Sequence, residues 1–259
     1  GNCFILKPSE RDPSSTGLLV EMVHDAGIPP GVLNLVNGGK ETVDAILRNK
    51  DIGSVSFVGS TPIAHYVYQE SAKYGKKVQA MGGAKNHMVV MPDADMDLVT
   101  DSIMGSVFGS AGERCMAISV VVPVGKETGD IIREKVIPKI ENLKIGPGND
   151  PSSEMGPLVT KQHLNKVKKY IDAGVKEGAE LVIDGRNFNL QGYENGYFLG
   201  GSFFDNVTTD MSIYKEEIFG PVMSMVRSKS LTEALEMINK HEFGNGTAIF
   251  TSDGGVARK

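Results

Sequence analysis

The sequence has 259 residues, of which 40% are hydrophobic and 23% charged, and its net charge is −5. This length suits one large domain or two ordinary ones, and the composition is that of a globular protein. The small negative charge gives nucleic acid or an acidic membrane surface no electrostatic attraction. No apolar run approaches the roughly 18 residues that a membrane span needs, so we expect neither partner.

The first third of the chain alternates short apolar stretches with amphipathic ones. We expect four strands in it, at 3–6, 32–36, 55–58 and 77–80. We expect helices between them, at 13–27, 41–48 and 61–74. Strands and helices that alternate over short connections predict a parallel α/β sheet, with its ligand crevice outside the carboxyl ends of the strands. Cys3 lies within the first strand and is predicted to be a core residue.

A change of composition at Met81-Gly82-Gly83 predicts a domain boundary, with domains 1–81 and 82–259. The second part again alternates strands and helices. We expect its strands at 88–91, 119–124, 181–183, within 216–226, and at 247–251. We expect its helices through 103–108 and at 130–143, 163–177 and 231–239. The Gly-rich and aromatic segment 192–201 is predicted to be an irregular loop or a β-arm.

A candidate nucleophile lies in the segment Gly109–Ala117, which holds Cys115. The small residues before Cys115 leave room for a ligand, and the positive charge of Arg114 favours the nucleophilic thiolate. Local sequence alone leaves a buried structural thiol open as the alternative. Cys3 and Cys115 have no Cys/His cluster around them. This argues against a disulfide scaffold or a metal site and suits a reducing compartment.

Two segments at predicted strand ends suit a nucleotide. Lys7 and Glu10 follow the first strand and offer groups for ribose hydroxyls, and Gly59-Ser60 opens a helix whose free N–H groups suit a phosphate. Taken singly, these segments fit a solvated turn and an ordinary helix cap equally well. The sequence contains no G-x-G-x-x-G fingerprint and no Walker motif, which excludes an ordinary Rossmann or P-loop reading.

The combination of motifs is more specific than its parts. In order and spacing the chain resembles the aldehyde dehydrogenase superfamily from residue 1 to residue 259. The resemblance implies part of a parallel, Rossmann-like NAD-binding domain followed by an α/β catalytic domain. It is carried by Lys7–Glu10, Phe57–Thr61, the Gly82-Gly83 turn, Gly112–Cys115 and Glu216–Pro221. Three passages resemble the methylmalonate-semialdehyde dehydrogenase branch: Gly83–His87, Gly112–Ala117 and Gly244–Ala248.

The resemblance implies a role for each motif residue. Cys115 matches the nucleophile, whose thiolate attacks the aldehyde carbon and whose backbone N–H helps to hold the oxyanion. Arg114 is apt for the carboxylate of a semialdehyde substrate, although a local salt bridge, for example to Glu113, is the alternative.

The implied cofactor is NAD. Lys7 and Glu10 match contacts to the adenosine ribose, and Gly59-Ser60 matches the pyrophosphate contact. Glu217 matches the nicotinamide-ribose ligand, and Phe219 matches the aromatic side chain near the nicotinamide.

Two positions depart from the superfamily pattern. Met81 occupies the place of a glutamate that activates the hydrolytic water, and Ala64 replaces a glycine of the phosphate-binding turn. A thioether cannot act as a base, which argues against release of the acyl group to water. The resemblance implies release to coenzyme A instead, with loss of CO2, as in valine or inositol breakdown. His87 is a candidate substitute base, but its position favours packing.

Other readings stay open at this stage. They are a hydrolytic semialdehyde dehydrogenase that releases free acid, a non-catalytic family member, and an unrelated thiol hydrolase that would need a histidine near Cys115. The resemblance further implies a chain about twice as long, with an oxyanion-hole Asn upstream and an oligomerisation strand downstream. We therefore expect an internal fragment that is inactive alone, with an unpaired edge at Phe4 prone to associate. The parent would be a homodimer or homotetramer, cytoplasmic in bacteria or in the mitochondrial matrix in eukaryotes.

Overall fold

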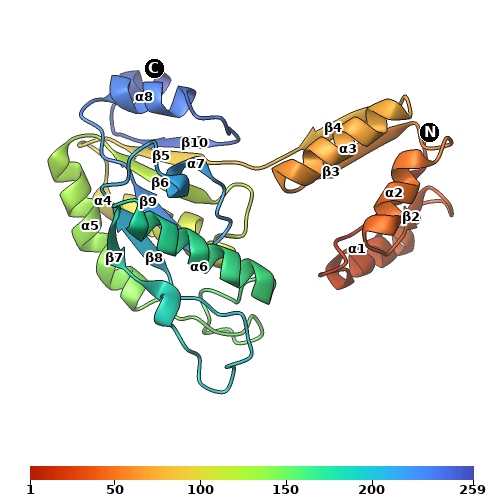
Figure 1. Ribbon diagram of the computed structural model, residues 1–259, viewed down its shortest axis with the longest axis horizontal. Helices are drawn as coiled ribbons and strands as arrows, with labels where there is room; N and C mark the ends of the chain where they lie inside the picture. The colour runs from red at the N-terminus through yellow and green to blue at the C-terminus, as the bar shows by residue number, and fades with distance from the viewer. The chain divides into compact units, whose positions relative to one another are not determined.

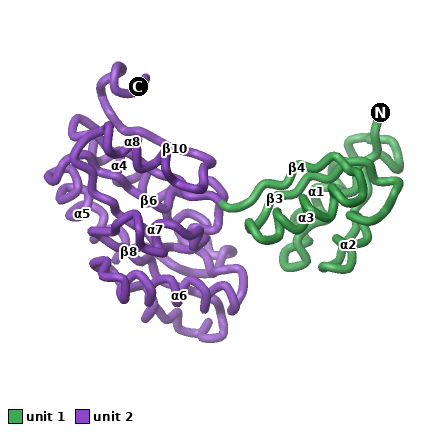
Figure 2. The backbone as a smooth tube through the Cα atoms, turned by 45° about the horizontal axis from the view of Figure 1, so that its top comes forward, with its two compact units in different colours: residues 1–83 green, residues 84–259 purple.

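The computed structural model describes residues 1–259 and divides into two compact units, Gly1–Gly83 and Ala84–Lys259 (Figure 2). We refer to them as unit 1 and unit 2. Both are built from alternating strands and helices, as the α/β prediction requires (Figure 1). Each unit is described by itself below.

Unit 1 contains two separate pairs of parallel strands rather than the single sheet that the sequence predicts. In the first pair, β1 (Phe4–Leu6) lies beside β2 (Leu33–Leu35). In the second, β3 (Ser54–Val58) lies beside β4 (Lys77–Met81). The helices form where they are predicted: α1 (Ser14–Asp25), α2 (Lys40–Arg48) and α3 (Thr61–Lys73).

The core of unit 1 is small. Its buried apolar side chains are Val20, Leu47, Ala64 and Val67. Phe4, in the strand predicted to be buried, is 55% exposed, and the prediction that Cys3 is a core residue is wrong because this side chain is exposed. The reason is physical: a pair of short strands has two faces, and the single helices beside it cannot cover both.

Unit 2 is organised around one six-stranded sheet with the order β10-β5-β6-β9-β8-β7. All neighbouring strands are parallel except β7 and β8, which are antiparallel. The strands are β5 (Asn86–Val90), β6 (Ile118–Pro123), β7 (Glu180–Ile183), β8 (Ser202–Asp205), β9 (Val222–Met225) and β10 (Thr247–Phe250). The central strands are buried along their whole length, which explains their continuous apolar runs.

Helices cover this sheet, with α5 next to α4 and α6 in front of the strands in Figure 1. The α5 helix buries Ile132, Val136 and Ile140, and α6 buries Val167 and Ile171. The helices are α4 (Met96–Ile103), α5 (Lys126–Glu141), α6 (Lys161–Lys176), α7 (Ser212–Lys215), α8 (Leu231–Asn239) and α9 (Gly254–Arg258). A π-helical turn (Met104–Phe108) and short 3-10 turns (Gly109–Gly112, Gly185–Asn187) complete the unit.

Unit 2 differs from the sequence prediction at β8 and at the start of α5, and it decides between the two alternatives for segment 192–201. Strand β8 was not predicted, because its four residues follow a Gly-rich segment and carry no alternating pattern. The segment 192–201 contains no strand, so the loop alternative is correct and the β-arm is not. Helix α5 begins at Lys126 rather than near residue 130, directly after Gly125, whose φ of 88° suits the sharp entry.

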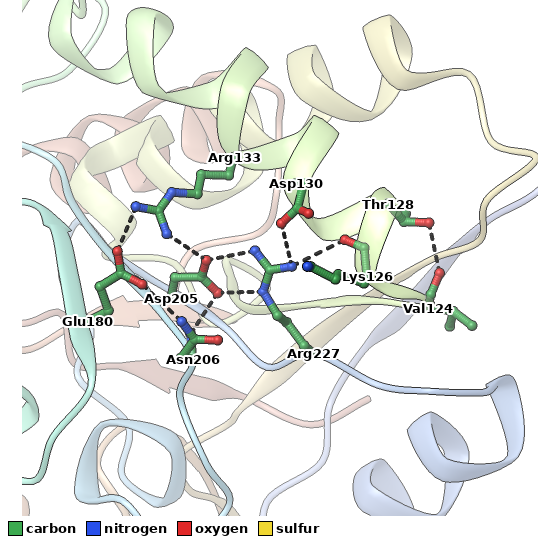
Figure 3. A network of polar contacts seen from close by, with 9 residues as sticks. All are labelled: Val124, Lys126, Thr128, Asp130, Arg133, Glu180, Asp205, Asn206 and Arg227. Carbon is green, nitrogen blue, oxygen red and sulfur yellow. Dashed lines mark hydrogen bonds and ion pairs between the residues drawn. The ribbon is translucent and has the colours of Figure 1, made fainter.

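An ionic network lies at the carboxyl ends of β8 and β9 in unit 2 (Figure 3). Asp205, the last residue of β8, is fully buried and accepts hydrogen bonds from Arg227 at 2.8 and 2.9 Å and from Arg133 at 3.1 Å. Arg227 also binds Asp130, and Arg133 binds Glu180.

No helix in the structure is long and apolar enough to cross a membrane. No group of three His, Cys, Asp or Glu side chains is arranged to hold a metal ion.

Candidate active site

The hollow of unit 2 lies at the amino edge of its parallel strands. Cys115 precedes β6, Asn86 is the first residue of β5, and Gly220 precedes β9. The hollow has a volume of about 350 Å³ including space open to solvent, and Arg114, Cys115, Glu217 and Phe219 are among the residues that line it.

The Cys115 loop has an unusual backbone. It follows the π-helical turn, and Ser110 and Ala111 have φ values of 52° and 54°, which side chains other than glycine rarely adopt. Gly112 has a φ of 70°, and a Cβ there would lie 2.3 Å from the carbonyl oxygen of Gly220. Strained backbone of this kind collects at functional sites, where the surrounding packing maintains it. Cys115 itself is exposed, so it is not the buried structural thiol that local sequence left open.

Arg114 makes no ion pair in the structure. Its Nη2 donates a hydrogen bond of 2.5 Å to the carbonyl oxygen of Gly105 in the π-helical turn. The predicted alternative, a salt bridge to Glu113, does not form. The guanidinium of Arg114 keeps further donors for an anion in the hollow.

Two asparagines bind the main chain of the Cys115 loop. Asn86 Nδ2 donates to the carbonyl oxygens of Cys115 and Ala117, at 2.8 and 2.9 Å. Asn245 Nδ2 donates to the same Cys115 oxygen at 2.9 Å. Neither asparagine was singled out from the sequence, although both lie in passages that carry the family resemblance.

The opposite wall is the segment that holds Glu217 and Phe219. One carboxylate oxygen of Glu217 accepts the N–H of Ala84 at 3.0 Å, and Phe219 has a φ of 58°. Lys85 is fully buried and donates to the carbonyl oxygens of Ile213 and Glu216, at 2.8 and 2.7 Å. Burial lowers the pKa of Lys85 to about 7, against the opposing effect of Glu217 and Glu216. Lys85 therefore holds this wall in place from inside.

His163 links the Cys115 loop, through Glu113, to the segment that holds Glu217 and Phe219. His163 Nε2 lies 2.5 Å from the carbonyl oxygen of Phe219 and 3.4 Å from Oε1 of Glu113. A carbonyl can only accept, so Nε2 carries the proton. Burial lowers the pKa of His163 and raises that of Glu113, which favours the neutral form of each. The sequence offered no signal for this contact, because His163 lies on α6, far from both partners in sequence.

His87 is not a substitute base. It lies in β5, is buried, and has its Nε2 3.3 Å from the hydroxyl of Tyr214. Burial, together with nearby His241, lowers the pKa of His87 to about 4. Its side chain packs in an aromatic cluster with Tyr214 and His241 and is absent from the lining of the hollow, so the packing alternative is correct.

The other predicted cofactor residues belong to unit 1 and follow the carboxyl ends of its strands. Lys7 comes after β1, where its Nζ lies 3.3 Å from Oε2 of exposed Glu10. Gly59-Ser60 follows β3, and the exposed Ser60 is the N-cap of α3 without a side-chain capping bond. The hydroxyl of Ser60 and the N-terminus of α3 are thus available to a phosphate, which fits a dinucleotide. Met81 ends β4 with a 46% exposed side chain.

Comparison with protein families matches residues 1–259 to the aldehyde dehydrogenase family. A malonate-semialdehyde dehydrogenase of Pseudomonas aeruginosa is 60% identical over 258 residues, 100% of this chain and 52% of that protein. One of Geobacillus kaustophilus is 51% identical over 100% of this chain and 53% of that protein. The chain spans about half the length of the curated relatives it matches.

Solved structures agree. A protein of Sinorhizobium meliloti assigned as a methylmalonate-semialdehyde dehydrogenase, in complex with NAD, has a TM-score of 0.97 and 58% identity, covering 100% of this chain and 52% of that one. The methylmalonate-semialdehyde dehydrogenase of Oceanimonas doudoroffii has a TM-score of 0.96 and 52% identity, covering 100% of this chain and 53% of that one.

Proposed function

The chain belongs to the aldehyde dehydrogenase family, and we propose that the longer protein to which it corresponds oxidises malonate or methylmalonate semialdehyde with NAD and coenzyme A. The observation that carries this proposal is the hollow of unit 2, where an exposed thiol and a guanidinium line the same space. A semialdehyde of this kind offers an electrophilic carbon for the thiol and a carboxylate for the guanidinium. The names of the relatives support the same substrate class.

In this proposal Cys115 acts as the nucleophile. Its thiolate attacks the aldehyde carbon, and the carbonyl π electrons become an oxyanion that the Cys115 N–H helps to hold. When the oxyanion reforms the carbonyl, hydride leaves the carbon, and an acyl thioester with Cys115 results. Arg114 grips the substrate carboxylate during these steps, because a planar guanidinium binds a carboxylate through two parallel hydrogen bonds.

NAD, when bound, accepts the hydride that leaves the substrate carbon. In unit 1, Lys7, Glu10 and Gly59-Ser60 offer groups that suit this cofactor. In unit 2, taken by itself, Glu217 and Phe219 do so. Ser60 and the N-terminus of α3 suit the pyrophosphate. Glu217 uses only Oε1 on the N–H of Ala84, so its other carboxylate oxygen is free for a ribose hydroxyl. The S. meliloti structure in complex with NAD supports this choice of cofactor.

Coenzyme A would release the acyl group. Met81 takes the place of the usual glutamate and cannot deprotonate water, and His87 is buried away from the hollow. A thiol needs less help, since a few per cent of it is thiolate at neutral pH. Loss of the carboxylate as CO2 before release would leave the electron pair of the broken C–C bond on a thioester enolate, which takes a proton from water to give an acetyl or propionyl thioester. The coenzyme A thiolate then attacks the thioester carbonyl carbon and expels the Cys115 thiolate.

Steady-state NADH formation by the full-length protein, with and without coenzyme A, tests the proposal. We expect a burst of NADH equivalent to the enzyme, a stall without coenzyme A, and resumed turnover on its addition. An equal rate with and without coenzyme A would make water the acceptor and the enzyme hydrolytic. Absence of even the burst would support the non-catalytic alternative. We further propose that the full-length protein is a homodimer or homotetramer, in the cytoplasm of a bacterium or the mitochondrial matrix of a eukaryote.

A further inference from the structure

The strongest unexplained feature of the hollow is the side chain of Asn86. It is 1% exposed, and its amide makes three hydrogen bonds. Nδ2 donates to Cys115 O and Ala117 O, while Oδ1 accepts the N–H of Gly246 at 2.9 Å. Two carbonyl acceptors and one N–H donor demand an amide in this orientation, because a carboxylate has no hydrogen to donate. Only asparagine satisfies all three partners at this length of side chain.

The strand pairing is irregular beside Asn86. Asn86 pairs with Ile118 and His87 pairs with Val120, so the extra residue lies on β6, the strand that follows the Cys115 loop. Irregularities of this kind are frequent next to active sites. Asn86 contacts the loop before β6, while the neighbouring His87 packs against Tyr214.

The carbonyl of Cys115 is bound twice. Besides Asn86, Asn245 also binds this oxygen. Its Nδ2 donates to it from the segment just before β10, 130 residues further along the chain. A carbonyl oxygen has two lone pairs, so Asn86 and Asn245 together use the full capacity of this acceptor. An exposed loop carbonyl would find water without help. Two side chains directed at one such oxygen thus fix its direction rather than merely satisfy it.

The direction of this carbonyl determines the conformation of the loop. The N–H of Ala117 donates to Arg114 O at 3.0 Å and closes a turn with Cys115 and Met116 at its centre. In such turns, the peptide between the two central residues is the one that rotates between type I and type II, with ψ of the first central residue changing from about −30° to about +120°. That peptide carries the Cys115 carbonyl. Its rotation would break both asparagine contacts.

From this geometry we propose that Asn86, assisted by Asn245, is a positioning residue that locks the Cys115–Met116 peptide and so holds the nucleophile in its reactive orientation. The proposal rests on the proposed function only in taking Cys115 as the nucleophile. It assigns no chemistry to Asn86, which acts through the main chain of Cys115. Asn86 ranks above Asn245, because it is buried and binds three partners while Asn245 is exposed and binds one.

The first test is the reactivity of Cys115 in the full-length protein, with Asn86→Asp and Asn86→Ser. Each variant is alkylated with iodoacetamide between pH 6 and 9, and modification of the Cys115 peptide is followed by mass spectrometry, which separates it from exposed Cys3. At pH 7 we expect at least a tenfold slower reaction for Asn86→Asp, whose carboxylate cannot donate to either carbonyl oxygen. Asn86→Ser keeps one hydroxyl donor and should lose less.

Asn142→Ala is the matched control. Asn142 Nδ2 also donates to a main-chain carbonyl, that of Pro138 at 2.7 Å, but at the end of α5. It should alkylate as fast as the parent. Folded Asn86 variants that alkylate within twofold of the parent would overturn the proposal. Turnover adds a second readout, because a lost orientation lowers kcat while the KM for NAD stays within twofold.

Asn245 keeps the proposal testable if Asn86→Asp fails to fold. We expect Asn245→Ala to slow alkylation three- to fivefold. In a double-mutant cycle that combines Asn245→Ala with Asn86→Ser, the effects on the alkylation rate should not be additive, because both side chains bind the same oxygen. Additive effects, or none for Asn245→Ala, would contradict the shared lock. Alkylation needs neither NAD nor coenzyme A. The role of Asn86 can therefore be tested even if the full-length protein does not catalyse the proposed reaction, and the two failures can be told apart.

Discussion

Unit 1 and unit 2 use one architecture in opposite ways. Both have parallel strands that alternate with helices. In unit 1 the candidate residues Lys7 and Ser60 follow the carboxyl ends of strands, whereas in unit 2 Cys115 and Glu217 precede the amino ends. The difference shows that the parallel α/β arrangement alone does not decide which edge of a sheet carries chemistry. The edge left open by the packing decides it.

The packing of unit 2 explains its choice. At its carboxyl edge, buried Asp205 and two arginines close the ends of β8 and β9, while its amino edge carries Gly112 and other small residues that leave a hollow. Unit 1 has no comparable closure and buries few apolar side chains. One edge of unit 2 therefore contributes stability and the other contributes reactivity. The following variants of the full-length protein test that division.

The largest effect is expected at the closed edge. Asp205→Ala leaves two arginines without their buried partner and should lower the free energy of unfolding by about 3–5 kcal/mol, measured by urea denaturation. Asp97→Ala, which removes an exposed ion pair with Lys135, is the control and should cost less than about 1 kcal/mol. Cys115 in folded Asp205→Ala should alkylate at the parent's rate. Equal losses in the two variants, or slowed alkylation, would contradict the division.

At the open edge, Gly112→Ala should be the most damaging substitution. The new Cβ meets the Gly220 carbonyl and the φ of 70° disfavours a side chain, so we expect a loss of about 2–4 kcal/mol. Alkylation of Cys115 should slow as well, since the loop must move. Gly148→Ala is the matched control, because a Cβ there meets nothing within 4 Å. If both variants behave alike, the close approach to Gly220 does not hold the loop.

Acid should weaken the closed edge selectively. Burial alone would raise the pKa of Asp205, but the hydrogen bonds from Arg227, Asn206 and Arg133 lower it overall. A depressed carboxyl pKa contributes stability that is complete above the unfolded value of about 3.9 and is lost as pH falls through the folded value. The stability difference between the parent and Asp205→Ala should thus be constant from pH 7 to 5. Below pH 4 it should narrow by up to about 1.4 kcal/mol per unit. If the difference in the free energy of unfolding between the parent and Asp205→Ala widens on acidification, the pKa of Asp205 is not lowered in the folded protein.

Arg114→Leu tests whether the open amino edge of the unit 2 sheet binds the carboxylate of the substrate. Loss of the guanidinium should raise KM for carboxylated semialdehydes at least tenfold, about 1.4 kcal/mol. Propionaldehyde has no carboxylate and serves as the internal control, with a much smaller change. Equal losses for both substrates would instead assign Arg114 to the loop, through its bond to Gly105.

The smallest effect is expected in unit 1. Glu10 should repel the 2′-phosphate of NADP, so Glu10→Gln should lower KM for NADP about fivefold, or about 1 kcal/mol, and change KM for NAD little. Glu21→Gln, an exposed substitution in α1, is the control. A parallel change for both cofactors would argue against a ribose contact at the end of β1.

The sequence by itself determined the local structure of this protein. Apolar periodicity and capping residues predicted every strand of unit 1 and helices such as α8, because these signals act within a few residues. It also determined the family, since motifs such as Gly112–Cys115 keep their order and spacing. Strand β8 escaped prediction because it follows a Gly-rich segment and its residues show no alternation of apolar and polar side chains.

Only the tertiary structure decided burial, sheet edges and the partners of the nucleophile. Cys3 looks like a core residue until the strand pair around it proves too small to cover it. Asn86 gives no local sign of its role, because Gly246, which donates to it, is 160 residues away. Arg227, Arg133 and Asp205 likewise come from three separate parts of the chain: the loop after β9, helix α5 and strand β8. Such contacts depend on how elements pack, and periodicity does not encode them.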